Sequence, residues 1–167
     1  INGWETDASD DLGEIWDSGF AGVPSHDGDQ HAEINATRFA ALFQDVNTSP
    51  GARMTWSFAH RGRKGVDAIR LEIGPPGGPY VSEGTYADGK HNWGVYTGDY
   101  NVPEGQTVTR FRYVAISTAR GHISIGNFLD AISFEECIQV VDGTVAENDP
   151  TCFVLAVGEN RDTIDLG

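Results

Sequence analysis

The chain has 167 residues, of which 39% are hydrophobic, and its 25 Asp and Glu against 11 Lys and Arg give a formal net charge of −14. This length predicts one domain with a buried hydrophobic core. The charge argues against a nucleic-acid ligand, which requires clustered Lys and Arg, and against an anionic membrane surface. No apolar run approaches the roughly 20 residues of a membrane-spanning helix.

Turn residues recur along the chain, and 21 of its residues are glycine. This rhythm is typical of a sandwich or barrel of short antiparallel strands. The clearest strand pattern is in 54–60, where Met54, Trp56 and Phe58 share one face. In chain order, strands are predicted at 12–16, 31–35, 41–46, 54–60, 68–73, 93–100, 109–116 and 131–135.

Segments that break regular structure separate these strands. Residues 74–79 consist of glycine and proline alone, so we expect an exposed loop there. We expect this excursion to continue through 82–91, and loops of that length are usually functional or disordered. One short helix is expected over 35–41.

These patterns predict an all-β protein with an antiparallel β-sandwich over residues 1–136. Residues 137–167 are expected to form a hairpin, with strands at 140–145 and 153–157, followed by a polar tail. The two cysteines, Cys137 and Cys152, flank this hairpin. A disulfide between them implies an oxidising compartment, and two buried free thiols are the alternative.

A series of short motifs runs in a characteristic order over residues 1 to 135, at 3–6, 14–20, 32–36, 43–46, 56–62, 96–98 and 126–132. The series resembles the galactose-binding-like jelly rolls of bacterial surface proteins and adhesins. It is similar to CenC-type carbohydrate-binding modules and to DUF642-like proteins of plant cell walls. The resemblance implies a jelly roll of two facing sheets, a secreted or cell-surface location, and a glycan ligand.

The resemblance also implies one structural Ca²⁺. In such relatives a late aspartate, matched here by Asp130, ligates the ion with help from the opening strand, where Asn2 and Glu5 are the candidate partners. Ala131 stands where the family usually has a second acidic residue or Asn, so the match is incomplete. The alternative is that Asp130 caps a turn.

Candidate glycan-binding residues are aromatic, because an aromatic ring packs against the apolar face of a sugar. Tyr80, Tyr86 and Trp93 lie in or after the glycine- and proline-rich segment. For Trp93 the alternative is a position in a core strand.

A basic stretch, 60–64, follows a predicted strand and contains His60 and Arg61. Because Arg grips a carboxylate with two hydrogen bonds, an acidic sugar is a candidate ligand of this stretch. The alternative is a structural ion pair of Arg61 with Glu33 or Asp67. The nearby segment 26–31 contains Asp and His, but its spacing fits a turn better than a metal site.

No nucleophile-elbow, zinc-protease or phosphate-loop motif is present. We therefore expect a non-catalytic carbohydrate-binding module whose partner is a polysaccharide. One alternative is a structural or adhesive subunit of a surface protein or filament that self-associates through a strand edge. The other is a polysaccharide lyase or hydrolase.

Overall fold

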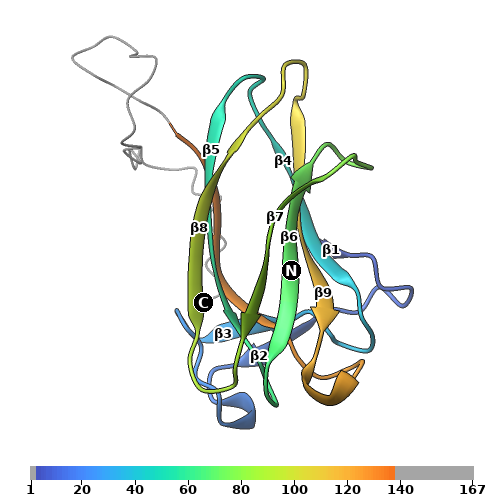
Figure 1. Ribbon diagram of the computed structural model, residues 1–167, viewed down its shortest axis with the longest axis vertical. Coiled ribbons are helices and arrows are strands. Elements are labelled where there is room, and N and C mark those ends of the chain that lie inside the picture. The colour runs from blue at the N-terminus through green and yellow to red at the C-terminus, as the bar shows by residue number, and fades with distance from the viewer. Residues whose placement is uncertain (1–2, 138–167) are drawn as a thin grey trace, which may run out of the picture.

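The computed structural model describes residues 3–137, which form two antiparallel sheets packed face to face (Figure 1). Sheet 1 has five strands in the order β1-β4-β9-β6-β7, and sheet 2 has five in the order β2-β3-β10-β5-β8. Most strands have neighbours that are distant in sequence, as in a jelly roll. The predicted all-β sandwich is confirmed.

The strands of sheet 1 are β1 (Trp4–Thr6), β4 (Ala41–Asn47), β9 (Val108–Ser117), β6 (Asp67–Gly74) and β7 (Val81–Asp88). Those of sheet 2 are β2 (Glu14–Asp17), β3 (Gln30–Glu33), β10 (Phe128–Glu136), β5 (Arg53–Arg61) and β8 (Gly94–Asn101). Two short 3-10 helices, η1 (Phe20–Gly22) and η2 (Ala119–Gly121), lie in loops. Within the described residues, no helix is long and apolar enough to cross a membrane.

The core lies between the sheets and follows the period-two pattern of the strands. Trp56 and Phe58 of β5 point inward from sheet 2, while Leu71 and Tyr113 point inward from sheet 1. The rings of Phe58 and Tyr113 meet edge-on, with their centroids 5.0 Å apart. Burial of rings of this size supplies much of the free energy that holds two sheets together.

Two expectations about local structure were wrong, and one strand was missed. Residues 81–88 form β7 instead of continuing the loop, and their inward positions Gly84 and Tyr86 give no apolar alternation to predict a strand. Residues 35–40 form bends instead of a helix, and β4 begins at Ala41. The short strand β1 was not predicted.

A bulge interrupts β10 at Ala131, where φ is 47° and the pairing with β5 shifts between Asp130 and Ser133. The extra residue lets Asp130 and Ser133 face outward on the same side, although three positions separate them. Beyond the bulge, the backbone N–H of Cys137 donates to the carbonyl of Arg53 at 2.7 Å. Cys152 and the predicted hairpin strands lie outside the described residues, so the disulfide stays a prediction.

Candidate binding site

The outward face of sheet 1 carries a cluster of arginines. In β9, Phe111 and Tyr113 point into the core, so Arg110 and Arg112 between them point outward. The strand register places Asp45 opposite Arg110, and it places Phe43 and Glu72 on the two sides of Arg112. We call this surface the arginine face; its residues are Phe43, Asp45, Arg70, Glu72, Tyr80, Arg110 and Arg112.

Arg110 is held in a fixed position on this face. Its Nε and Nη2 donate to the two carboxylate oxygens of Asp45 at 2.6 and 2.8 Å. The guanidinium carbon lies 3.8 Å from the centre of the Phe43 ring, so the cation also stacks on an aromatic surface. The hydrogen bond with Asp45 raises the pKa of Arg110 above its usual value. A planar group fixed in this way can present its free edge to a ligand without losing much conformational entropy.

Arg112 contacts carboxylates both within the arginine face and in a loop at its border. Its Nη2 lies 2.8 Å from a carboxylate oxygen of Asp7, in the loop after β1, and its Nη1 lies 3.6 Å from Glu72. Arg70 pairs with the other oxygen of Glu72 at 2.6 Å. The Nε of Arg112 is buried and has no hydrogen-bond partner.

Tyr80 reaches this face because the glycine- and proline-rich loop folds back on β6. A side chain at Gly74 would lie 2.5 Å from the carbonyl oxygen of Pro79, so the close approach requires glycine there. The backbone N–H of Gly77 donates to the Tyr80 hydroxyl at 3.2 Å. The guanidinium of Arg112 then lies 5.1 Å from the Tyr80 ring centre. Tyr80 is therefore the one predicted binding aromatic that lies on the arginine face.

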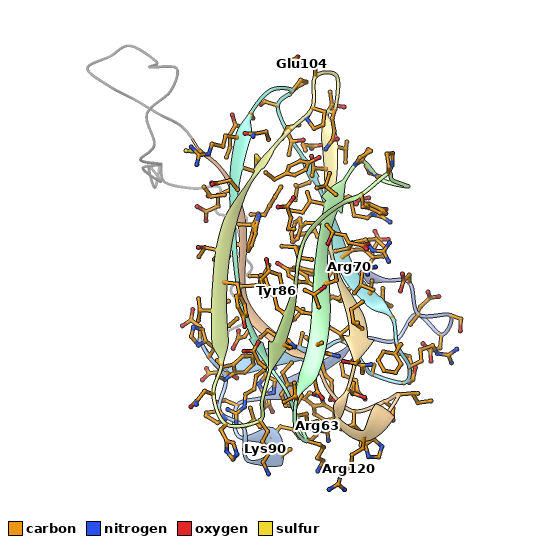
Figure 2. The ribbon with its side chains drawn as sticks, in the orientation of Figure 1. Arg63, Arg70, Tyr86, Lys90, Glu104 and Arg120 are labelled. Carbon is orange, nitrogen blue, oxygen red and sulfur yellow. The ribbon has the colours of Figure 1, made fainter. Side chains whose placement is uncertain are left out.

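Two loops project on the same side of the sandwich as this face (Figure 1). One is the β6–β7 loop that carries Tyr80, and the other is the loop after β1 that carries Asp7. Figure 2 shows Arg70 on this side of β6 and Tyr86 between the two sheets. The face therefore combines fixed charged groups, one accessible ring and two bordering loops.

The other predicted binding residues lie elsewhere. His60 is fully buried, with Nδ1 2.7 Å from Asp88 and Nε2 3.0 Å from Asn127. Arg61 is 8% exposed and its guanidinium donates to the backbone carbonyl of Lys90. Neither side chain is available to a glycan in this structure. The expected pairing of Arg61 with Glu33 or Asp67 is also wrong, because a different arginine, Arg63, binds Glu33.

Of the two remaining aromatic candidates, Tyr86 belongs to the interior and Trp93 lies in a loop. Tyr86 packs between Phe58 and Tyr96, with ring centroids 5.1 and 4.4 Å away, so it is a core residue and not a binding platform. Trp93 is half-buried in the β7–β8 loop, where its Nε1 donates to the carbonyl of Pro24 at 3.0 Å. Trp93 keeps part of its ring accessible.

The residues predicted to bind calcium are not brought together. Glu5 lies on the outward face of sheet 1, opposite Phe43, whereas Asp130 lies on the outward face of sheet 2. Because about 10 Å separates the mean planes of packed sheets, these two carboxylates do not ligate one ion. Asn2 lies outside the described residues, and within 3–137 no three His, Cys, Asp or Glu side chains are grouped closely enough to hold a metal.

Asp130 instead fastens a loop. Its Oδ2 accepts hydrogen bonds from the backbone N–H groups of His26 and Asp27 at 2.6 and 3.1 Å, and its Oδ1 accepts one from Ala131 at 2.7 Å. Burial raises the pKa of this carboxyl, while the three N–H donors act in the opposite direction. This geometry matches the alternative that Asp130 caps a turn.

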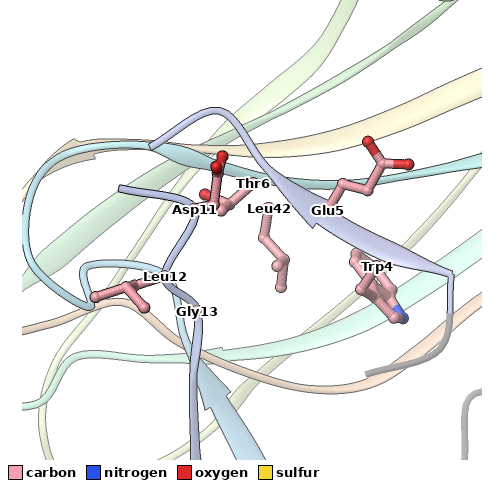
Figure 3. A pocket seen from close by; sticks show the side chains of 7 residues that line it. All are labelled: Trp4, Glu5, Thr6, Asp11, Leu12, Gly13 and Leu42. Carbon is pink, nitrogen blue, oxygen red and sulfur yellow. The ribbon is translucent and has the colours of Figure 1, made fainter. Parts of the chain in front are cut away.

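Two hollows lie away from the arginine face, and a third, of about 600 Å³, lies between the β6–β7 and β8–β9 loops, where Pro79, Val81 and Tyr100 line it. One opens at the edge between β1 and β2, has a volume of about 460 Å³, and is shown in Figure 3 with Trp4 and Leu42 as its apolar lining and Glu5 and Asp11 nearby. The other, of about 360 Å³, is a shallow trough on the outward face of sheet 2. It is lined mainly by small hydroxyl side chains of Thr55, Ser57, Thr97 and Ser133, and it contains no exposed aromatic ring.

No family model and no curated protein matches this chain. Solved structures do resemble it. The CBM22-2 xylan-binding domain of Paenibacillus barcinonensis Xyn10C superposes with a TM-score of 0.58 at 14% identity, covering 81% of this chain and 92% of that one. The C-terminal family 22 carbohydrate-binding module of Clostridium thermocellum Xyn10B gives 0.58 at 14%, covering 85% and 90%.

A third similar structure is the module TmCBM61 in complex with β-1,4-galactotriose, with a TM-score of 0.53 at 15% identity, covering 81% of this chain and 89% of that one. At these identities the likeness establishes the fold and nothing finer. The fold is the β-sandwich seen in these carbohydrate-binding modules, and the specific resemblance to the CenC and DUF642 types stays an expectation.

Proposed function

We propose that this protein is a non-catalytic module that binds a polysaccharide through the arginine face of sheet 1. The observation that carries the proposal is the pair of outward arginines, Arg110 and Arg112, each fixed by a carboxylate and each lying near an aromatic ring. Neighbouring hydroxyls of a sugar match the spacing of two N–H groups on one guanidinium, while a tyrosine ring packs on the apolar face of the pyranose.

Preorganisation supports this assignment. A free surface arginine would lose side-chain entropy on binding, whereas Arg110 is already held by both oxygens of Asp45. Among the similar structures are a xylan-binding domain and a module in complex with β-1,4-galactotriose, so the fold is used elsewhere to bind glycans.

The same geometry favours binding over catalysis. Hydrolysis of a glycosidic bond requires two carboxyl groups in different protonation states, one of them kept neutral by an apolar pocket. On the arginine face, Asp45 and Glu72 lie against guanidinium groups instead. We therefore propose binding without bond cleavage.

An extracellular location and a structural Ca²⁺ remain part of the proposal. The first rests on the predicted disulfide and on where polysaccharide ligands occur. The second rests on the family resemblance alone, since Glu5 and Asp130 lie on opposite outward faces. Thermal unfolding with and without a chelator tests the calcium expectation.

Binding is tested by isothermal titration against a panel of soluble polysaccharides that includes xylan and β-1,4-galactan. We expect micromolar affinity for at least one of them, and no release of reducing ends from any. Tyr80→Ala should weaken that affinity by about tenfold, equivalent to about 1.4 kcal/mol. Val95→Ala is the matched control, because Val95 is exposed on the outward face of sheet 2. Absence of binding across the panel, or equal loss in both variants, would overturn the proposal.

A further inference from the structure

A second surface differs from the rest of the molecule in how its Lys and Arg side chains are paired. Away from the end of the sandwich formed by the β5–β6, β7–β8 and β9–β10 loops, every described Lys or Arg pairs with a carboxylate. These pairs are Arg38 with Asp10, Arg53 with Asp99, Arg70 with Glu72, Arg110 with Asp45, and Arg112 with Asp7. In a chain of net charge −14, such complete pairing is expected.

The three loops named above break this rule, and we call the surface that they form the basic end; its loops are residues 62–66, 89–93 and 118–127. Lys64, Lys90 and Arg120 are exposed there and have no ion pair, while the guanidinium of Arg61 binds a backbone carbonyl. All the described cations that lack a carboxylate partner therefore lie at one end. Figure 2 shows Arg63, Lys90 and Arg120 together at that end.

Contacts between the loops hold these cations close to one another. The backbone N–H of Gly62 donates to the carbonyl of Gly89 at 3.3 Å, and Arg61 binds the carbonyl of Lys90 itself. Gly65 lies so close to Ala119 that a side chain at Gly65 would come within 2.8 Å of the Ala119 methyl group. The buried carboxylate of Asp67 accepts from the backbone N–H of Arg63 at 2.8 Å and of Ala119 at 2.6 Å. The basic end is therefore a braced surface.

The carboxylates at this end do not neutralise it by pairing. Asp67 is used by backbone N–H groups, Asp88 by His60 and Tyr96, and Glu33 by Arg63. Asp27 and Asp29 are exposed in the segment before β3, and neither forms an ion pair with a described residue. Lys64, Lys90 and Arg120 thus have no carboxylate partner among the described residues.

We propose that the basic end binds anionic groups carried by a polysaccharide, as a second site separate from the arginine face. The ligand class is a chain of sugars bearing carboxylates or sulfate esters. Such groups accept charge-assisted hydrogen bonds from Lys and Arg. Trp93 is half-buried in the same loop as Lys90.

Anionic polysaccharides and nucleic acids differ in how closely their negative charges are spaced, and this difference favours a polysaccharide as the ligand of the basic end. A nucleic acid carries one charge for about every 1.7 Å of duplex, and the remaining negative surface of this protein would repel it. A polysaccharide with spaced anionic groups meets the cations of one end with less repulsion from the rest. The proposal extends the assigned function, but it depends on different residues.

The test uses polygalacturonate as a carboxylate probe and dextran sulfate as a sulfate probe, each titrated at about 20 mM and about 200 mM salt. The variant Lys90→Gln/Arg120→Gln removes two unpaired cations. The control Arg38→Gln/Arg53→Gln removes the same charge from paired sites away from this end. We expect the first variant to weaken binding of at least one probe by about tenfold at low salt, and the control to change it less than twofold.

The outcomes separate this proposal from the assigned function. Binding of an anionic probe that depends on Lys90 and Arg120, whether or not a neutral polysaccharide binds, supports the basic end. Failure of both probes to bind at low salt, or equal weakening in the two variants, overturns it. If single-stranded DNA bound as tightly as the two polysaccharide probes, the proposal that the ligand is a glycan would be overturned. Neutral polysaccharide binding should survive in both variants, and its absence in the wild-type protein would count against the arginine face alone.

Discussion

The outward face of sheet 1 is open to solvent, whereas half of the outward face of sheet 2 is covered by the chain itself. On sheet 2 the side chains of His31, Glu33, Phe128 and Asp130 are at most 1% exposed. The segment between β2 and β3 contacts His31 and Asp130, while Arg63 and Trp16 contact Glu33. On sheet 1, Arg110 and Asp45 keep a fifth to a third of their side chains exposed.

This contrast separates polar groups that hold the fold from polar groups that meet a ligand. Both faces carry charged residues at the outward positions of their strands, so residue type alone does not distinguish them. Covered charges must be fully paired, because an unpaired buried charge costs several kcal/mol. Exposed charges contribute little to stability and remain available for binding.

The largest expected effect comes from Glu33, in the covered half of sheet 2. Its carboxylate accepts from Arg63 at 2.9 Å, from the indole N–H of Trp16 at 2.8 Å and from the N–H of Gly126 at 2.6 Å. Glu33→Ala leaves all three donors without an acceptor and should lower the free energy of unfolding by about 3–5 kcal/mol. Urea denaturation measures this. The matched change on sheet 1, Glu72→Ala, should cost about 1 kcal/mol or less, and equal losses would remove the contrast.

His31 makes the covered face sensitive to acid. Burial, with a smaller contribution from Arg61, lowers the pKa of His31 from 6.5 to about 4. Between these values the unfolded chain binds the proton and the folded chain does not, so stability falls as the pH drops from about 6.5 towards 4. The contribution of this one group is at most about 3 kcal/mol.

Unfolding of the wild-type protein and of His31→Gln should therefore be compared from neutral pH to about pH 4.5. The difference in unfolding free energy between the two proteins should shift in favour of His31→Gln as the pH falls. Parallel curves would show that His31 does not titrate in this way.

Asp130 tests whether a covered carboxylate serves the fold directly or through a metal. Asp130→Ala removes the acceptor for the N–H groups of His26 and Asp27 and should cost about 2 kcal/mol. Because this loss comes from hydrogen bonds, it should be the same with and without a chelator. A loss that disappears in the chelator would show that Asp130 acts through Ca²⁺, as the family resemblance implies.

The smallest effect is expected for Asp45 on sheet 1. Asp45→Asn weakens a partly exposed ion pair with Arg110 and should lower the free energy of unfolding by about 0.2–1 kcal/mol, less at high salt. Chemical denaturation at two salt concentrations measures it. A cost above about 2 kcal/mol would mean that the arginine face is structural.

Most core strands could be predicted from the sequence, because the alternation of apolar and polar residues indicates which side chains are buried. Met54, Trp56 and Phe58 fell on the inward face of β5 as expected. The strand β7 was missed because its inward positions are Gly84 and Tyr86. Glycine at 84 leaves room for the Tyr86 ring, so the segment lacks the alternation of apolar residues that predicts a strand.

The binding face was harder to predict for a related reason. Arg110 and Arg112 were visible as outward residues of a predicted strand, but their partners Asp45 and Glu72 come from strands whose pairing depends on the fold topology. His60 and Arg61 were predicted to bind a ligand because they lie in a basic stretch that follows a strand. In the structure, Asp88, Asn127 and the Lys90 carbonyl satisfy them inside the protein.

The central claim is that polysaccharide binding belongs to the arginine face of sheet 1. The most direct measurement is the affinity of Arg112→Gln for the best polysaccharide of the panel, compared with that of Arg53→Gln. Both arginines pair with an exposed aspartate, at 2.8 and 2.9 Å, but Arg53 lies on sheet 2. The account predicts about a tenfold loss of affinity for Arg112→Gln and less than a twofold change for Arg53→Gln. Unchanged affinity in Arg112→Gln, or the larger loss in Arg53→Gln, would contradict it.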